Sequence, residues 1–205
     1  MLAFLGWNPG TPQEIFSLEE LIQAFSLERV GKSGAKFDPD KTKWFNEQYL
    51  RAKSNQELAQ LIKPLVDEKG YSYPNEEYLA AFCGLMKERA TFIEDMLQDD
   101  FLFNAPSNYD EKTLSKKWKE NTPEIIKELK TILENISDFN AENIETEFKA
   151  FLERKSLGFG AVLPNFRLLV TGLGMGPSMF EICALLGKEE TLKRIEVGME
   201  KFTTA

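Results

Sequence analysis

The chain of 205 residues contains no histidine. Imidazole is the general base of Ser-His and Cys-His catalytic triads and a common zinc ligand, so sites of these kinds are excluded. No pair of carboxylates, metal-ligand cluster or activated nucleophile stands out in their place. We therefore expect neither catalytic residues nor a metal site in this chain.

Cysteines and long apolar runs are scarce as well. Cys83 and Cys183 lie far apart in apolar helical contexts, which predicts buried, unreactive thiols and no disulfide scaffold. No stretch approaches the ~18 consecutive apolar residues of a membrane helix, and residues 1–14 lack the pattern of a secretory signal. These features predict a cytoplasmic protein with no membrane contact.

Helix signals, in contrast, are frequent. Ser17 and Ser54 begin capping boxes, and Asp38 precedes a proline at the first position of another predicted helix. Pro64 predicts a kink or a restart within the helix that follows Ser54. No alternating strand of useful length occurs, so we predict an all-α protein. A Pro-, Asn- and Ser-rich break at 101–110 precedes six predicted helices, at 110–121, 122–136, 140–155, 162–172, 178–187 and 188–202.

The net charge of −8 is unevenly distributed. Residues 29–55 contain seven basic and three acidic side chains, a net charge of +4, and residues 154–205 contain seven and five, a net charge of +2. Two basic stretches that carry aromatic residues fit an RNA-binding face on an acidic protein. A solvated basic surface is the simpler explanation, and both stay open at this point.

Glycines at positions 172, 174 and 176 suggest a dinucleotide-binding loop, but that motif places its third glycine where this chain has Pro177. The preceding residues 166–170 fit the end of a helix better than a parallel strand. We therefore expect a tight loop between two helices.

Three blocks of sequence carry a family resemblance. Residues 2–10 read LAFLGWNPG, and residues 37–51 read FDPDKTKWFNEQYLR. Near the end of the chain, RLLVTG begins at Arg167, GPSMFEI at Gly176 and LLGK at Leu185. In this order the blocks resemble signature segments of bacterial glutamyl-tRNA synthetases. One departure is that Pro164 stands three residues before Arg167, where the family proline usually stands two residues before.

The resemblance implies the C-terminal, tRNA-binding part of a class I ligase that charges tRNA-Glu with glutamate by using ATP and Mg²⁺. The HIGH-type and KMSKS-type motifs of the family's catalytic half do not occur here. It implies that 1–36 ends a stem-contact region, that 37–120 is one anticodon-binding helical bundle and that 121–205 is a second. The implied partner is the anticodon loop of tRNA-Glu, with no DNA binding, and we expect a monomer.

Arg89 matches the family arginine that reads the third anticodon base. Cytosine presents the acceptors O2 and N3 on its pairing edge, which suit a guanidinium donor, whereas guanine presents N1–H and N2–H₂ donors there. Non-discriminating relatives carry glutamine at this position. Arg89 therefore implies an enzyme that rejects a glutamine tRNA whose anticodon ends in G.

Further site residues follow from the same resemblance. Trp44 fits either a base-stacking platform or a core anchor of its helix, and Lys43 and Arg51 fit either phosphate contacts or solvation. Arg167 is expected to contact a base or a phosphate, and Pro177 to present its backbone towards a base. Which of Met175 and Met179 touches tRNA stays open, because each fits core packing as well.

A different class of function is a stand-alone helical protein-interaction module that reuses the fold. The net charge favours it, because RNA binding is driven by phosphate neutralisation. An independent hydrolase or transferase finds no supporting residues. The feature that discriminates between the two functions is whether Trp44, Arg89 and Arg167 share one exposed concave face. The tRNA interpretation loses its site if two of the three are buried in separate cores.

We predict that this chain alone does not activate glutamate, because it lacks the ATP-binding motifs. Glutamate-dependent exchange of pyrophosphate into ATP should stay at the background of a reaction without protein. Exchange that rises with the concentration of the chain would contradict this expectation.

Overall fold

A computed structural model describes residues 1–203 except 33 and 35. Ser33 and Ala35, in the expected region 1–36, and residues 204–205 of the expected region 121–205 therefore lie outside the described residues. The described part contains ten α-helices and four short 3₁₀ helices. Its pairing of extended backbone is an isolated bridge between Trp7 and Val30, with no strand. The prediction of an all-α protein is confirmed.

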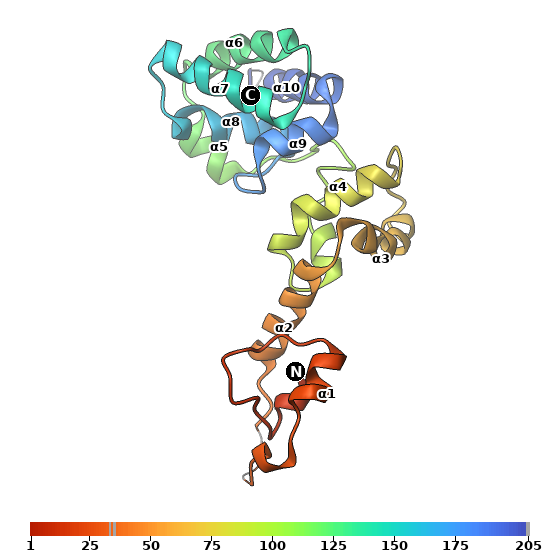
Figure 1. Cartoon of the computed structure of the whole chain (residues 1–205). Helices are drawn as coiled ribbons and strands as arrows, with labels where there is room; N and C mark the ends of the chain where they lie inside the picture. Colours follow the sequence, from red (N-terminus) through yellow and green to blue (C-terminus); the bar gives the residue numbers. More distant parts are fainter. Residues whose placement is uncertain (33, 35, 204–205) are drawn as a thin grey trace.

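The helices follow one another along an elongated molecule (Figure 1). The first half contains η1 (Leu2–Phe4), α1 (Leu18–Ala24), η2 (Leu27–Arg29), α2 (Pro39–Ala52), α3 (Asn55–Glu68), α4 (Glu76–Met86), η3 (Lys87–Arg89) and η4 (Ile93–Leu97). The second half contains α5 (Glu111–Lys117), α6 (Thr122–Asn135), α7 (Ala141–Lys155), α8 (Phe159–Thr171), α9 (Met179–Leu186) and α10 (Lys188–Thr203).

Local sequence explains where most of these helices begin and end. Ser17 and Ser54 form the predicted capping boxes, and the Asp38 carboxylate accepts hydrogen bonds from two N–H groups of the first turn of α2. Gly187 ends α9 with a φ of 81°, as expected for a C-cap glycine. Of the two outcomes expected at Pro64, a kink or a restart, the restart does not occur, because α3 runs through Pro64.

Figure 1 shows three parts along the long axis. The N-terminal segment with α1 lies at one end, and α2 leads from it to the pair α3 and α4. Helices α5 to α10 form a bundle at the other end, in which α10 packs against α6, α8 and α9, and α5 against α8. Helix α4 contacts α9, so the central pair and the bundle meet there.

One continuous apolar core joins the central pair to the bundle. Its fully buried side chains include Leu58, Ile62 and Phe82 on the central side and Phe148 and Phe166 in the bundle. Helix α5 packs against the bundle, although the expected division placed it in 37–120. The boundaries at 36/37 and 120/121 stay predictions.

A buried arginine strengthens this junction. Arg194 is 4% exposed, and its Nε lies 2.7 Å from the Glu190 carboxylate. Its Nη1 donates to the carbonyl of Val170 at 3.1 Å and also to the carbonyl of Phe101. A buried cation is tolerated when its donors are satisfied in this way. The side chain therefore ties the start of the 101–110 segment to α8 and α10.

We predict that Arg194→Met lowers the free energy of unfolding by about 3 kcal/mol, because two buried carbonyls lose their donor. Chemical denaturation monitored by circular dichroism measures this value. The exposed neighbour Lys193 supplies the control, and Lys193→Met should change stability by no more than about 0.5 kcal/mol. Equal effects of the two substitutions would contradict the role assigned to Arg194.

Candidate nucleic-acid interface

Arg89 lies at the end of η3, directly after α4, and its side chain is exposed. Helix α2 fixes the backbone on its N-terminal side through Arg51. The Arg51 Nη2 donates to the Glu88 carbonyl at 3.1 Å, and the Arg51 Nε lies 3.4 Å from the Glu88 carboxylate. The Glu47 carboxylate also forms an ion pair with Arg51, with 3.9 Å between Oε2 and Nη2.

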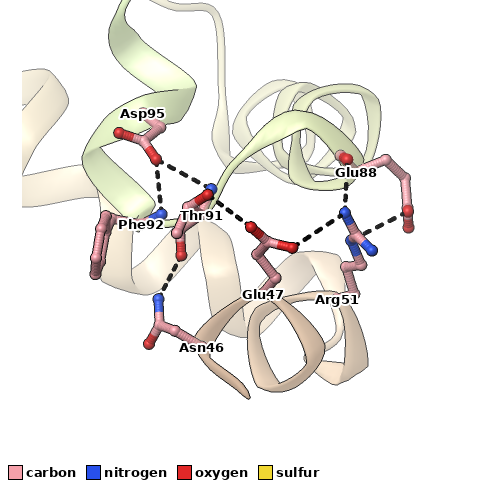
Figure 2. A network of polar contacts seen from close by, with 7 residues as sticks. All are labelled: Asn46, Glu47, Arg51, Glu88, Thr91, Phe92 and Asp95. Atoms are coloured by element: carbon pink, nitrogen blue, oxygen red, sulfur yellow. Dashed lines mark hydrogen bonds and ion pairs between the residues drawn. The ribbon is translucent and has the colours of Figure 1, made fainter. Parts of the chain in front are cut away.

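Helix α2 holds the backbone on the other side of Arg89 as well. The Asn46 side-chain amide donates to the Thr91 carbonyl, and the Thr91 hydroxyl donates to the Glu47 carboxylate at 2.8 Å. The Asp95 carboxylate accepts hydrogen bonds from the N–H groups of Thr91 at 3.0 Å and Phe92 at 2.8 Å. Figure 2 shows this network, which fixes the chain on both sides of Arg89.

The tight inter-helix loop expected at the three glycines is present between α8 and α9. Gly172 ends α8 at a φ of 77°, and a Cβ there would lie 2.5 Å from the Asn108 carbonyl oxygen. Its own carbonyl accepts a hydrogen bond from the Asp110 N–H at 2.8 Å. Ser178 then caps α9. The loop at 172–178 is therefore held in place by the 101–110 segment.

The loop brings two predicted site residues together. The Arg89 Nη2 donates to the Gly176 carbonyl at 2.6 Å, and the Arg167 Nη2 donates to the Pro177 carbonyl at 2.7 Å. Arg167 is 8% exposed, and its Nη1 is buried without a hydrogen-bond partner. Burial and, to a lesser extent, the positive charge of Arg89 lower the pKa of Arg167. Two guanidinium groups thus approach adjacent carbonyls of one loop.

Neither guanidinium has a carboxylate partner within the described residues. Arg194, by contrast, is buried with Glu190 beside it. Clustered cations without counter-charges attract anions and hydrogen-bond acceptors. The exposed Arg89 can offer its remaining N–H donors to such a ligand, whereas Arg167 is enclosed.

The other residues predicted in or beside the loop differ in how exposed they are. Pro177 is buried, and its carbonyl faces Arg167 within the protein. Met179 is 1% exposed and belongs to the core, whereas Met175 is 82% exposed. Of the two methionines, Met175 is therefore the side chain that the loop presents at the surface.

The α2 residues form a second group. Arg51 is engaged with Glu47 and Glu88, next to Arg89. Trp44 is half-buried, with its ring edge-on to Phe45 at 5.1 Å. Seven residues separate Trp44 from Arg51, so both lie on one face of α2, about 10 Å apart along its axis. Lys43 is exposed and lies 4.0 Å from Asp40.

Sequence reasoning missed several supports of the site. Gly176 contributes through its carbonyl oxygen and its lack of a side chain, and neither property leaves a distinctive signal. Asn46 and Glu47 were part of the 37–51 block, but their partner Thr91 lies far along the chain. Spacing alone could not pair them.

Other kinds of site are not indicated. Burial raises the pKa of the Cys83 and Cys183 thiols to about 12 each, which confirms buried thiols that stay neutral near pH 7. In the part of the chain that the structure describes, no cluster of acidic or cysteine side chains could hold a metal ion. No helix among those residues has the length and apolarity needed to cross a bilayer.

Comparison with known proteins identifies the class. A family model described as an anticodon binding domain matches residues 57–199, which span most of α3, α4, the loop at 172–178 and most of the bundle. The chain belongs to this family.

Its relatives are glutamate–tRNA ligases, which are class I synthetases. The ligase of Flavobacterium johnsoniae is 50% identical over 95% of this chain, and that of Phocaeicola vulgatus is 48% identical over 97%. A crystal structure of the ligase from Elizabethkingia meningosepticum, in complex with its amino acid, superposes with a TM-score of 0.90 at 38% identity over 97% of the chain. The chain spans 39% of each of these proteins and corresponds to their C-terminal part.

We predict that Asp95→Ala lowers the free energy of unfolding by about 1 kcal/mol, because two backbone N–H groups after Arg89 lose their acceptor. Hydrogen exchange should show faster exchange at Thr91 and Phe92, with α8 and α10 unaffected. Asp99→Ala is the matched control, since Asp99 is exposed. Unchanged exchange at Thr91 and Phe92 in the Asp95 variant would contradict the network of Figure 2.

Proposed function

We propose that this chain reads the anticodon of tRNA-Glu as part of a glutamate–tRNA ligase. The observation that carries the proposal is the exposed guanidinium of Arg89, which is fixed where the central pair meets the bundle and has no counter-charge among the described residues. The whole ligase would activate glutamate with ATP and Mg²⁺ and transfer it to tRNA. Within that ligase this chain would contribute binding energy and would itself hold no cofactor.

The selectivity follows from hydrogen-bond chemistry. An anticodon base is unstacked and can present its pairing edge to a side chain. Arg89 carries only donors, so it matches the acceptors O2 and N3 of cytosine and opposes the N1–H and N2–H₂ donors of guanine. The chain should therefore favour an anticodon that ends in C and discriminate against a glutamine tRNA that ends in G.

The remaining residues are assigned supporting roles. Trp44 offers a half-buried ring on the same face of α2 as Arg51, and Lys43 lies beside it with an exposed charge. These side chains would contact the RNA away from the third base, by stacking and by phosphate contacts. We propose that the chain does so as a monomer, with its helices divided at 36/37 and 120/121 as the resemblance implies.

One observation favours a second candidate, a helical protein-interaction module. Leu18, Ile22 and Phe25 are exposed along one side of α1 and its end, and Leu27 and Phe37 are exposed nearby in sequence. Exposed apolar residues gathered in this way are typical of protein contacts. Helix α1 lies at the opposite end of the molecule from the bundle (Figure 1), whereas the Arg89 side chain bonds the loop between α8 and α9, so both functions can be tested separately.

We predict that Arg89→Gln removes the preference for a C-ending anticodon. A charged hydrogen bond to a base edge corresponds to about tenfold or more in affinity, so the ratio of dissociation constants for G-ending and C-ending anticodon stem-loops should fall from at least about 10 to near 1. Fluorescence anisotropy at low and moderate salt measures both constants. Arg154→Gln, on the exposed side of α7, is the matched control for the loss of one positive charge.

Three results would count against the proposal. Equal affinity of the native chain for both RNAs at every salt concentration would show that Arg89 does not read the base. An equal loss of selectivity in Arg154→Gln would assign the effect to net charge. Binding of a protein to the α1 surface without any RNA binding would favour the second candidate.

A further inference from the structure

We propose that Gly176 determines the selectivity of this site without touching RNA, because the Gly176–Pro177 backbone sets the direction of both guanidinium groups. The inference rests on the function proposed above and goes beyond it. It assigns Gly176 and Arg167, which belong to the bundle, as residues that position the side chain of Arg89, which follows α4 of the central pair.

The first step concerns how Arg89 is held. Its backbone is fixed by α2 on both sides, through bonds to Glu88 and Thr91. Those bonds do not themselves orient the Arg89 side chain. The hydrogen bond that orients the guanidinium runs to the Gly176 carbonyl at 2.6 Å. An arginine side chain loses much rotamer freedom when it is ordered. A carbonyl that orders it before RNA arrives lowers the cost of presenting its donors to a base.

The second step concerns how the Gly176 carbonyl is held. The next carbonyl, that of Pro177, accepts a bond at 2.7 Å from Arg167, which projects from α8 within the same bundle. The ring of Pro177 fixes its φ, which limits how far the Gly176 carbonyl can rotate relative to the Pro177 carbonyl. The order of support therefore runs from Arg167 to the Gly176–Pro177 backbone and from there to Arg89.

The third step concerns the lack of a side chain at position 176. A Cβ at Gly176 would lie 2.8 Å from the Arg167 Nη1, closer than real contacts allow. The Gly176 backbone is not in the left-handed region, so alanine would add this contact without backbone strain. Arg167 is enclosed and bonded, so relief of the contact must shift either its guanidinium or the loop. A shift of the loop moves the Gly176 carbonyl directly, whereas a shift of the guanidinium weakens its bond to the adjacent Pro177 carbonyl, which holds the Gly176 carbonyl in place.

The decisive experiment compares Gly176→Ala with the native chain in binding to C-ending and G-ending anticodon stem-loops. We expect the selectivity ratio to fall by about fivefold or more, mainly through weaker binding of the C-ending RNA. Gly160→Ala is the matched control, because Gly160 is exposed in α8 and a Cβ there would meet nothing within 4 Å. It makes the same change of glycine to alanine outside the loop and should leave the ratio unchanged.

Two double variants test the order of support. In an Arg89→Gln background, Gly176→Ala should cause no further loss of selectivity, because the side chain that it orients is absent. In an Arg167→Lys background, Gly176→Ala should have less effect than in the native chain, because lysine lacks the Nη1 atom that the new methyl group would meet. Additive effects in both backgrounds would overturn the inference.

The failure of this inference can be told apart from the failure of the proposed function. A selectivity ratio near 1 in the native chain overturns both. Loss of selectivity in Arg89→Gln, together with a ratio in Gly176→Ala that equals that of the native chain, overturns only the role of Gly176. An equal loss of affinity of Gly176→Ala for both RNAs does the same. If Gly176→Ala does not fold at the assay temperature, Arg167→Lys alone provides the test. A selectivity ratio in Arg167→Lys equal to that of the native chain then overturns the inference.

Discussion

The Glu88–Thr91 backbone is bonded to α2 while the Arg89 side chain is bonded to the loop between α8 and α9, and the geometry of the candidate site depends on this double attachment. The attachment in turn requires a firm junction between the central pair and the bundle. The shared apolar core and the contact of α4 with α9 provide it. Arg89 on either part alone would lack one of its two supports.

Two buried arginines show different uses of the same side chain. Arg194 has a carboxylate and two carbonyls as partners, so its cost of burial is offset by structural bonds. Arg167 has one carbonyl and an unpaired Nη1, and burial lowers its pKa. A buried donor without a partner reduces stability, so Arg167 contributes less to folding than Arg194 does.

The sequence could predict what depends on neighbours in the chain. Capping boxes at Ser17 and Ser54, the C-cap at Gly187 and the glycine loop at 172–176 all follow from local patterns, and all are present. Family resemblance predicted Arg89 and Arg167 as site residues, and the structure brings them together. Contacts between distant segments, such as Thr91 with Glu47, leave no periodic signal. Local preference likewise left open whether the helix kinks or restarts at Pro64, and α3 continues through it between the buried side chains of Ile62 and Val66.

The 101–110 segment looks like a linker in sequence but is built into the body of the molecule. Phe101 and Leu102 are buried, Arg194 donates to the Phe101 carbonyl, and the Asp110 N–H donates to the Gly172 carbonyl at the start of the loop between α8 and α9. A hybrid protein that exchanged α5–α10 for those of a relative would therefore inherit a mismatched loop if the join fell inside this segment. Natural variation should respect the same unit, with the segment and the α8–α9 loop changing together as one module.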